Sequence, residues 1–459
     1  MAMAEAFPEV TPEILRRYDV PGPRYTSYPT VPEWSAEIGS AEQEQKLLEA
    51  GREATSPLSI YLHLPFCQEM CTYCGCNVVI SKDVQKADPY LEHLDREMAM
   101  AADRLGARRS FAQLHFGGGT PTFLNEAQLE RLWTTIRRYF HPSADAEIAI
   151  EIDPVVTTES QLRLLAGFGF NRLSMGVQDF DAEVQAAVHR VQSVEQTRAI
   201  VDAGRALGYR GINFDLIYGL PNQTPDRWRG TLERVLELGP DRLAVYSFAY
   251  LPDLRTHQRR IDASLLPTGP DKLALFRIAY EAFVRGGYRP IGMDHFARAE
   301  DELARAQERR TLFRNFQGYT VKAAADSVAF GVTGISDVQG AFFQTTRPLS
   351  HYYESIDAGR FATERGLLLS ADDKRRREVI TQIMCNFWVD LGPEAGSEFA
   401  GELEDLRVLE REGLVRVSGT EIEATPLGRV FIRNVAMVFD AYLRRTRAHG
   451  KTPQYSRTV

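Results

Sequence analysis

The chain has 459 residues, of which 44% are hydrophobic and 25% are charged, as in an ordinary globular protein rather than a disordered one. Its 54 basic and 62 acidic residues give a net charge of −8, so we expect neither a nucleic-acid nor a membrane partner. No uninterrupted apolar run is long enough to span a membrane. The first residues, MAMAEAFPEV, lack the basic and apolar segments of a secretory signal, and we expect a cytoplasmic protein.

The elements predicted in chain order fall into four regions. An N-terminal arm covers 1–58, a barrel 59–300, an extension and linker 301–369, and a mainly helical C-terminal domain 370–459. Within the arm, the stretch PGPRYTSYPT at 21–30 is predicted to be extended, because proline fixes φ and removes a hydrogen-bond donor.

Strands and helices are predicted to alternate through the second region. Short segments rich in β-branched and aromatic residues predict strands at 59–64, 113–116, 147–152, 172–177, 211–218 and 242–249. Helical spacing of apolar residues predicts helices at 90–105, 126–140, 159–168, 194–207 and 224–238, with N-caps at Asn125, Thr158 and Ser193. This α/β pattern favours a partial (β/α)6 TIM-like barrel, and a doubly wound sheet stays open.

The last region is predicted to hold helices around a small hairpin. Helical patterns cover 372–387, 401–412 and 426–445, and a β-like stretch covers 414–424. This arrangement is winged-helix-like, although no strongly basic recognition face accompanies it.

Four of the five cysteines lie within ten residues: Cys67, Cys71, Cys74 and Cys76. A clustered, odd count is not typical of a disulfide framework and favours a soft metal centre in a reducing compartment. Three cysteines spaced by four and three residues can bind three irons of a 4Fe–4S cluster and leave the fourth iron open. A zinc site, or buried inert thiols, are the alternatives. The distant Cys385 is interpreted as a buried helical thiol.

Polar and glycine-rich features follow each predicted strand. In strand order they are Cys67–Cys76, Gly117–Gly119, Glu151 with Asp153, Gln178, Asp215 with Tyr218, and Ala249. All of them fall at carboxyl ends of strands, where α/β barrels place their active sites.

The spacing C-x-x-x-C-x-aromatic-C, with Tyr73 as the aromatic residue, resembles the signature of the radical S-adenosylmethionine (SAM) superfamily. The blocks PRYTSYPT, YLHLPFCQEMCTYCGCN, HFGGGTPT, RLSMGVQDF, DLIYGLP, GMDHFA and NFQGYT, between about 21 and 320, resemble the oxygen-independent coproporphyrinogen III oxidases (coproporphyrinogen dehydrogenases). Related heme chaperones usually carry Phe where this chain has Cys76.

The resemblance implies an oxidoreductase of porphyrin and heme biosynthesis. Two propionates of coproporphyrinogen III would be oxidatively decarboxylated to vinyl groups, giving protoporphyrinogen IX. The implied cofactors are a 4Fe–4S cluster and SAM, with two SAM molecules expected. A low-potential electron donor and an electron acceptor of unknown identity are the implied partners, and the family favours a monomer.

The resemblance also assigns site residues. It implies that the cluster is held by Cys67, Cys71 and Cys74, and the SAM on it by Tyr61, Tyr73, Gly118, Glu151 and Ile335. The second SAM is matched by Gly119, Thr120, Gln178, Arg190, Asp215 and Ala249. The residues expected to be catalytic are Cys76, Tyr61 and Glu151, with Cys76 in a redox or proton-donor role.

A substrate with four carboxylates also needs local cations and polar contacts. Arg24, His295 and Gln317 are the predicted substrate contacts, and the arm around Arg24, Tyr25 and Tyr28 is a predicted lid. The alternative function is a heme chaperone-like radical SAM protein without decarboxylase activity. A third interpretation is a zinc-stabilised regulator that acts through the C-terminal domain.

Overall fold

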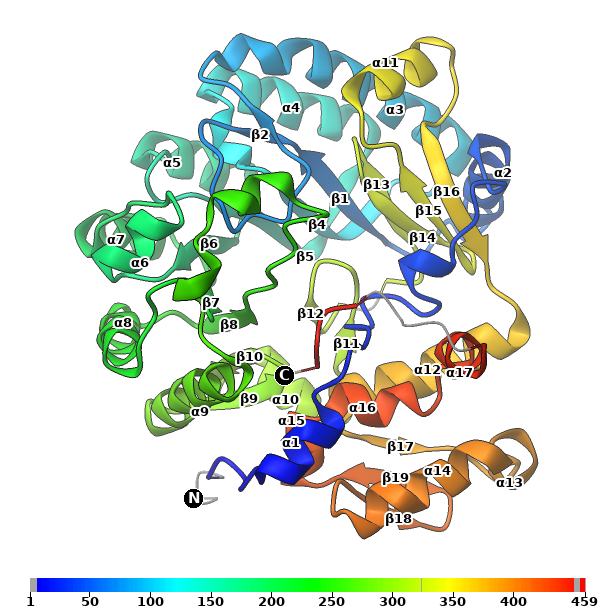
Figure 1. The fold of residues 1–459 in the computed structure, drawn as a ribbon. Coiled ribbons are helices and arrows are strands. Elements are labelled where there is room, and N and C mark those ends of the chain that lie inside the picture. Colours follow the sequence, from blue (N-terminus) through cyan, green and yellow to red (C-terminus); the bar gives the residue numbers. More distant parts are fainter. Residues whose placement is uncertain (1–5, 323, 450–454, 459) are drawn as a thin grey trace.

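Parallel strands form the centre of the molecule (Figure 1). The computed structural model describes residues 6–322, 324–449 and 455–458. Six parallel strands are neighbours in chain order: β1 (Leu58–Leu64), β4 (Ser110–Gly118), β5 (His141–Ile152), β6 (Arg172–Gln178), β7 (Gly211–Tyr218) and β8 (Arg242–Ser247). Because this order never reverses, the sheet is singly wound, and the doubly wound alternative is wrong.

Helices follow these strands and cover the outer face of the sheet (Figure 1). They are α3 (Asp88–Leu105), α4 (Glu126–Tyr139), α5 (Glu159–Phe168), α6 (Ala182–Ala187), α7 (Val194–Ala206), α8 (Pro225–Leu238) and α9 (Gly269–Arg285). The predicted N-caps Asn125, Thr158 and Ser193 are confirmed, each in a capping box with the glutamine three residues later.

The central strands separate an apolar face from a polar one. In β7 the buried residues Ile212, Phe214 and Leu216 alternate with Asn213 and Asp215. Strand side chains point alternately to opposite faces, so the first set packs beneath the helices and the second lines the barrel interior. The strand pattern therefore places polar groups inside the barrel.

Further strands extend the sheet at both edges. On the β1 side lie β13 (Ser327–Phe330), β14 (Ile335–Val338), β15 (Ala341–Thr345) and β16 (Thr363–Leu368), and on the β8 side lie β10 (His295–Arg298) and β9 (Tyr288–Gly292). The twelve-stranded sheet runs from β16 to β9, and no pairing of these two edges occurs within the described residues. The predicted partial barrel is therefore observed in open form.

The shorter elements connect this framework. They are β2 (Phe66–Cys67), β3 (Val79–Ile80), β11 (Phe313–Arg314), β12 (Tyr319–Thr320), α10 (Glu302–Glu308), α11 (Leu349–Asp357) and the short helices η2 (Val84–Ala87), η3 (Pro121–Phe123), η4 (Thr256–Arg260) and η5 (Ala263–Leu265).

The C-terminal region is mainly helical, as predicted. It contains α12 (Ala371–Asn386), β17 (Trp388–Asp390), α13 (Ala395–Glu398), α14 (Ala400–Arg411), β18 (Val415–Ser418), β19 (Glu421–Ala424), α15 (Pro426–Val430), α16 (Ile432–Met437) and α17 (Ala441–Ala448). The predicted single helix over 426–445 is wrong. Phe431 leaves helical geometry, and Asp440 caps a new helix by accepting a hydrogen bond from Leu443 N–H.

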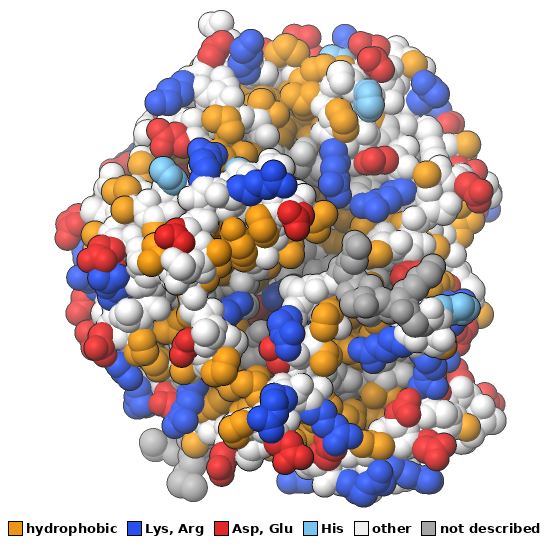
Figure 2. All heavy atoms as spheres, viewed as in Figure 1, with side chains coloured by type: hydrophobic (Ala, Val, Ile, Leu, Met, Phe, Trp, Pro, Cys, Tyr) orange, Lys and Arg blue, Asp and Glu red, His pale blue; other side chains and the backbone are white. Residues whose placement is uncertain are grey.

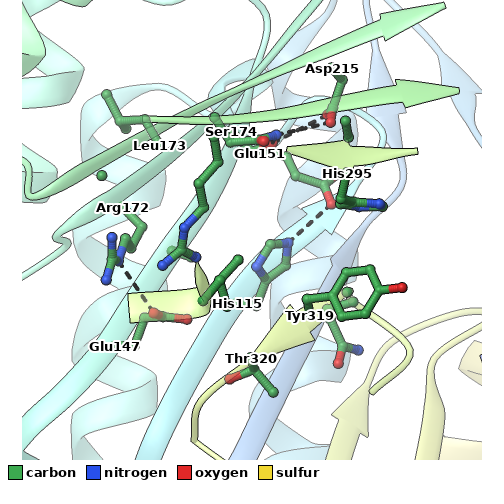
Figure 3. Close-up of a pocket in the computed structure, with 18 of the residues that line it drawn as sticks. His115, Glu147, Glu151, Arg172, Leu173, Ser174, Asp215, His295, Tyr319 and Thr320 are labelled. Atoms are coloured by element: carbon green, nitrogen blue, oxygen red, sulfur yellow. Dashed lines mark hydrogen bonds and ion pairs between the residues drawn. The ribbon is translucent and has the colours of Figure 1, made fainter. Parts of the chain in front are cut away.

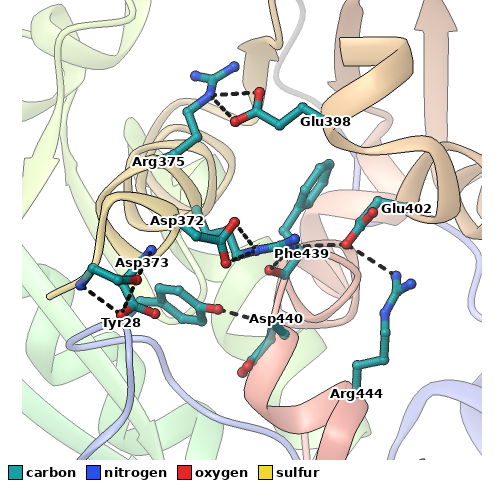
Figure 4. Close-up of polar contacts among 12 residues, drawn as sticks. Tyr28, Asp372, Asp373, Arg375, Glu398, Glu402, Phe439, Asp440 and Arg444 are labelled. Carbon is teal, nitrogen blue, oxygen red and sulfur yellow. Dashed lines mark hydrogen bonds and ion pairs between the residues drawn. The ribbon is translucent and has the colours of Figure 1, made fainter. Parts of the chain in front are cut away.

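Charged contacts join the helices of this region (Figure 4). Arg376 Nη1 donates to Glu402 at 2.9 Å, and Arg444 Nη2 lies 3.6 Å from the same carboxylate. Glu402 is buried, so it anchors α14 between α12 and α17.

The N-terminal arm crosses from the C-terminal region to the barrel (Figure 1). It contains α1 (Pro12–Tyr18), η1 (Val31–Glu33) and α2 (Ser40–Ala50), while 21–30 is free of helix as predicted. Tyr25 donates to Asp440 at 2.9 Å, and Tyr28 accepts from Ala441 N–H at 3.1 Å. The arm is therefore part of the C-terminal hydrophobic core rather than a free segment.

Within the described residues, no helix combines the length and the apolar character that crossing a bilayer requires.

Candidate functional site

The cysteine loop leaves the carboxyl end of β1. Cys67 ends β2, and the loop returns through β3, which pairs with β2 in parallel. Its middle is held from two sides, because Thr72 N–H donates to Val188 O at 3.1 Å and His257 Nε2 lies 2.8 Å from Cys74 O. These contacts present the thiols to the barrel mouth.

Most predicted site residues line one cavity of about 350 Å³, the cysteine-lined cavity. The cavity wall includes Cys67, Cys71, Tyr73, Cys74, Cys76, Gly118, Gly119, Thr120, Glu151, Gln178, Arg190 and Asp215. Arg190 follows α6, and the others come from the segments at the carboxyl ends of β1, β4, β5, β6 and β7. Residues far apart in the sequence are thus assembled at one end of the parallel strands.

The glycine turn at the end of β4, Gly117–Gly119, lies very close to the side chains of His63 and Glu151. Gly118 has φ +113°, and a Cβ there would lie 2.6 Å from the His63 ring. A Cβ on Gly117 would lie 2.8 Å from Glu151 Oε1. Only glycine fits such contacts without displacing its neighbours.

Glu151 lines the cysteine-lined cavity and also the two neighbouring pockets described below. Its Oε1 lies 3.0 Å from His115 Nε2, and its Oε2 accepts a hydrogen bond from Gly118 N–H at 3.2 Å (Figure 3). Although desolvation opposes ionisation, the contacts with His115 and Gly118 lower the pKa of Glu151. The carboxylate is thereby kept ionised and fixed in place.

Asp215 lies deeper on the same polar face. It accepts hydrogen bonds from Asn213 Nδ2 at 2.9 Å and from Ser174 Oγ at 3.2 Å (Figure 3). Burial, and then the negative charge of Glu151, raise the pKa of Asp215 to about 7. The two carboxyl groups therefore differ in charge state near neutral pH.

Arg190 is already paired within the chain. Its Nη1 donates to Asp153 at 2.6 Å and its Nη2 donates to Gly176 O at 2.9 Å. Its buried Nε has no hydrogen-bond partner among the described residues. Nearby, Gln178 has φ +64°, a strained conformation that turns the end of β6 into the cavity.

A neighbouring hollow of about 370 Å³ shares Cys76, Gly118 and Glu151 with the cysteine-lined cavity. Tyr61, Ile335 and Gln317 also line it, together with the cations Arg255 and Arg347. The Tyr61 ring stacks on His115 with centroids 5.8 Å apart, and its hydroxyl lies 3.2 Å from His63 Nδ1.

Three predicted residues lie outside the cysteine-lined cavity and the neighbouring hollow: His295, Arg24 and Ala249. His295 lines an interior pocket of about 160 Å³ together with Glu151 and Asp215 (Figure 3), and Gln317 lines this pocket as well as the neighbouring hollow. Arg24 and Ala249 line a separate cavity of about 500 Å³, the tail cavity, which the C-terminal residues 455–458 also line. Arg24 Nη2 donates to Asp294 at 2.5 Å, and His295 Nδ1 lies 2.9 Å from the other oxygen of that carboxylate.

The four clustered thiols differ in their surroundings. Burial raises the pKa of Cys67 to about 11. The hydrogen bond with the Cys76 side chain lowers the pKa of Cys74 to about 7 and raises that of Cys76. Cys76 is the most exposed of the four, whereas Cys385 is fully buried, in agreement with its interpretation as a structural thiol.

Sequence reasoning missed several residues of the site, among them His115, His257 and the cations Arg255 and Arg347. His115 occupies an inward position of β4, in register with Tyr61 on β1, and strand alternation after Gln113 could have identified it. His257 carries no such signal, because it reaches the cysteine loop from a helix 183 residues along the chain.

Comparisons with known proteins agree with this geometry. A profile of the Radical SAM superfamily matches residues 61–235. The oxygen-independent coproporphyrinogen III oxidase of Pseudomonas aeruginosa is 46% identical over 94% of this chain and 95% of its own. The chain belongs to the oxygen-independent coproporphyrinogen III oxidase family. The Escherichia coli relative of the same name is 44% identical, over 97% and 98% of the two chains.

A solved structure extends the agreement to the fold. Coproporphyrinogen III oxidase from Escherichia coli, described as a radical SAM enzyme, matches with a TM-score of 0.88 and 43% identity. The match covers 92% of this chain and 98% of that one. The two chains therefore share the same fold over most of their length.

Membership of this radical SAM family implies a 4Fe–4S cluster and SAM. Among the described residues, no group of three or more His, Cys, Asp or Glu is arranged around a single metal ion. The fit to a cluster rests on its donors: Cys67, Cys71 and Cys74 supply soft thiol ligands on one cavity wall. The glycine turn and Glu151 face them, which leaves space and a carboxylate for a ligand beside the cluster.

Proposed function

We propose that this chain catalyses the oxidative decarboxylation of coproporphyrinogen III to protoporphyrinogen IX. For each of two propionates, the side chain loses a hydrogen atom, CO₂ and one electron, and becomes a vinyl group. The observation that carries this proposal is the cysteine-lined cavity, where three thiols face Glu151 and the glycine turn at the carboxyl ends of the parallel strands. Full-length identity to relatives of that name supports the substrate.

We propose that Cys67, Cys71 and Cys74 hold the cluster and that Tyr61, Tyr73, Gly118, Glu151 and Ile335 surround the SAM beside it. When bound, these cofactors supply the electron and the radical that removes the hydrogen atom. The protein positions the SAM. Glu151 can accept hydrogen bonds from its ammonium or hydroxyl groups, and Gly118 lets the backbone approach it closely.

A second SAM is proposed beside the first. Gly119, Thr120, Gln178, Arg190 and Asp215 share the cysteine-lined cavity, which supports this placement. Ala249 lies in the tail cavity and is proposed to contact the outer end of that molecule. Arg190 is paired with Asp153, so it contributes a fixed positive charge rather than a free guanidinium.

Cys76 is proposed to act as a proton or redox partner without binding iron. Its exposed side chain and its hydrogen bond with Cys74 support this role. We also propose a low-potential electron donor, which reduces the cluster, and an electron acceptor, which takes the electron that each substrate radical releases as it loses CO₂.

The test is turnover of coproporphyrinogen III by anaerobically reconstituted protein supplied with SAM and a strong reductant. Formation of protoporphyrinogen IX together with CO₂, with SAM consumed in proportion, is the expected result. Tight porphyrin binding without decarboxylation would contradict the proposal and favour a chaperone-like role.

A further inference from the structure

The tail cavity lies between the end of β8, the N-terminal arm and the C-terminal tail. It shares Tyr246 with the interior pocket but shares none of its lining residues with the cysteine-lined cavity. Four cations, Arg24, Lys272, Arg433 and Arg457, line it against two carboxylates, Asp19 and Asp294. In a chain of net charge −8, this cavity has a local positive excess. Figure 2 shows a central hollow on the face in view, with Lys and Arg side chains among those near it.

Both carboxylates of the tail cavity already have arginine partners. Arg24 donates to Asp294 at 2.5 Å, and Arg457 Nε donates to Asp19 at 2.6 Å. Neither Lys272 nor Arg433 forms an ion pair with any residue that the structure describes. The positive excess is therefore carried by these two side chains.

Lys272 lies in the first turn of α9, whose N-terminus adds partial positive charge to the cavity. Its ammonium donates one hydrogen bond, to Phe248 O at 2.8 Å, although an ammonium has three donors. The stem crosses the ring of Tyr218 with Nζ 6.0 Å from the centroid. Burial lowers the pKa of Lys272, and the negative charge of Asp19, which is already paired with Arg457, offsets only part of that effect.

Arg433 contributes charge while serving a structural role. Its guanidinium donates to Pro23 O at 2.9 Å and to Arg457 O at 2.8 Å, so it joins the arm to the tail. It is only 6% exposed, and its hydrogen-bond partners are backbone carbonyls and a serine hydroxyl rather than carboxylates. Asp294 offsets part of its charge, and the rest adds to the positive potential of the cavity.

We propose that the tail cavity binds a carboxylate of the substrate, and that the Lys272 ammonium, beside Arg433, holds a propionate that is retained through the reaction. This inference rests on the proposed function. The reacting propionates must reach the cysteine-lined cavity, with which the tail cavity shares no wall. A propionate held at Lys272 therefore anchors the macrocycle and directs the opposite side chains toward Glu151.

The test uses the full chain with its cluster reconstituted, and two fluorescent porphyrins as probes. Coproporphyrin III carries four propionates, and protoporphyrin IX carries only the two that the reaction retains. Lys272→Met keeps the stem and removes the charge, so we expect both porphyrins to bind about tenfold more weakly. Lys272→Arg restores the charge and should bind both within about threefold of the wild type.

Kinetics give a second readout. With coproporphyrinogen III, Lys272→Met should raise KM with little change in kcat, because a retained propionate contributes equally to ground-state and transition-state binding. The matched control is Lys86→Met, an exposed lysine on η2, which should leave both parameters unchanged. Porphyrin binding by the wild type should also weaken as salt increases, a measurement that depends on no variant.

Three results would overturn the proposal. Equal porphyrin affinity in Lys272→Met and wild type would show that Lys272 does not bind a propionate. Loss confined to coproporphyrin III would assign Lys272 to a reacting propionate. Weaker SAM binding with unchanged porphyrin binding would mean that the carboxylate belongs to SAM. If the wild type binds neither porphyrin, the proposed function fails as well, which distinguishes the two outcomes.

Discussion

The Tyr352 hydroxyl donates a hydrogen bond to the Glu97 carboxylate at 2.8 Å, in the interior between α3 and α11. The same oxygen accepts from Gly331 N–H at 2.8 Å, so Glu97 also fixes the turn after β13. Glu97 is only 2% exposed, and burial raises its pKa to about 7. This carboxyl group is therefore protonated in the folded protein at pH values where it ionises in the unfolded chain.

That difference makes stability depend on pH. Between about pH 4.5 and about pH 7 the folded state holds one more proton than the unfolded state, so stability falls as pH rises through this window. Glu97→Gln removes this slope. The unfolding free energy of the variant minus that of the wild type should therefore increase by on the order of 3 kcal/mol when the pH is raised from about 5 to about 8. Urea unfolding at both pH values measures it, with exposed Glu130→Gln as the unaffected control.

Gly118→Ala should lower the stability of the protein, because the backbone conformation at this position suits only glycine. The added Cβ would meet the His63 ring at 2.6 Å in a left-handed conformation, which predicts a loss of about 1–3 kcal/mol in unfolding free energy. Gly230→Ala is the matched control, because it lies inside α8 with no atom within 4 Å of the new Cβ. That control should be neutral or stabilising by up to about 1 kcal/mol. Equal thermal midpoints for the two variants would contradict the argument.

The cysteines should separate into three groups by metal analysis. Replacing Cys67, Cys71 or Cys74 by serine is expected to abolish the brown colour and most of the bound iron and sulfide. Cys76→Ser should keep the cluster but lose turnover, and Cys385→Ala should keep both. A Cys76 variant that loses iron in the same proportion as Cys71→Ser would make it a ligand instead.

Glu151→Gln tests the connecting carboxylate. It removes the charge that accepts from Gly118 N–H and contacts His115, and charge-assisted hydrogen bonds contribute about 1.5–3 kcal/mol. We expect SAM to bind about ten- to a hundredfold more weakly while iron content stays unchanged. Equilibrium dialysis with SAM and release of 5′-deoxyadenosine measure the two effects. Unaltered SAM affinity would exclude Glu151 from that site.

The central sheet was predictable because its strands and helices follow local rules. Alternating apolar and polar residues identify β7. Asn125, Thr158 and Ser193 each cap a helix by accepting a hydrogen bond from the backbone N–H three residues later. The edge strands β13–β16 were missed because their pairing depends on partners far along the chain, as when Ser59 on β1 meets Ser327 on β13. The break at Phe431 is likewise set by tertiary packing in a buried core.

The candidate site was predictable only in part, for the same reason. The cysteine spacing and the strand-end positions indicated the residues that line the cysteine-lined cavity. Position on a strand does not reveal that Arg190 is already paired with Asp153, and helical spacing does not reveal that the Lys272 ammonium donates to Phe248 O. Those facts depend on which side chains the fold brings within about 3 Å of one another.

The place of β1 in the sheet has a consequence for biogenesis. β1 is flanked by β4 on one side and by β13 on the other, and Ile335 lies just beyond that second partner. A nascent chain that has emerged only through residue 300 already contains the three cysteines proposed to hold the cluster, but it lacks β13, which pairs with one flank of β1. β1, which leads into the cysteine loop, is therefore paired on both sides only after translation has passed β13 at Ser327–Phe330.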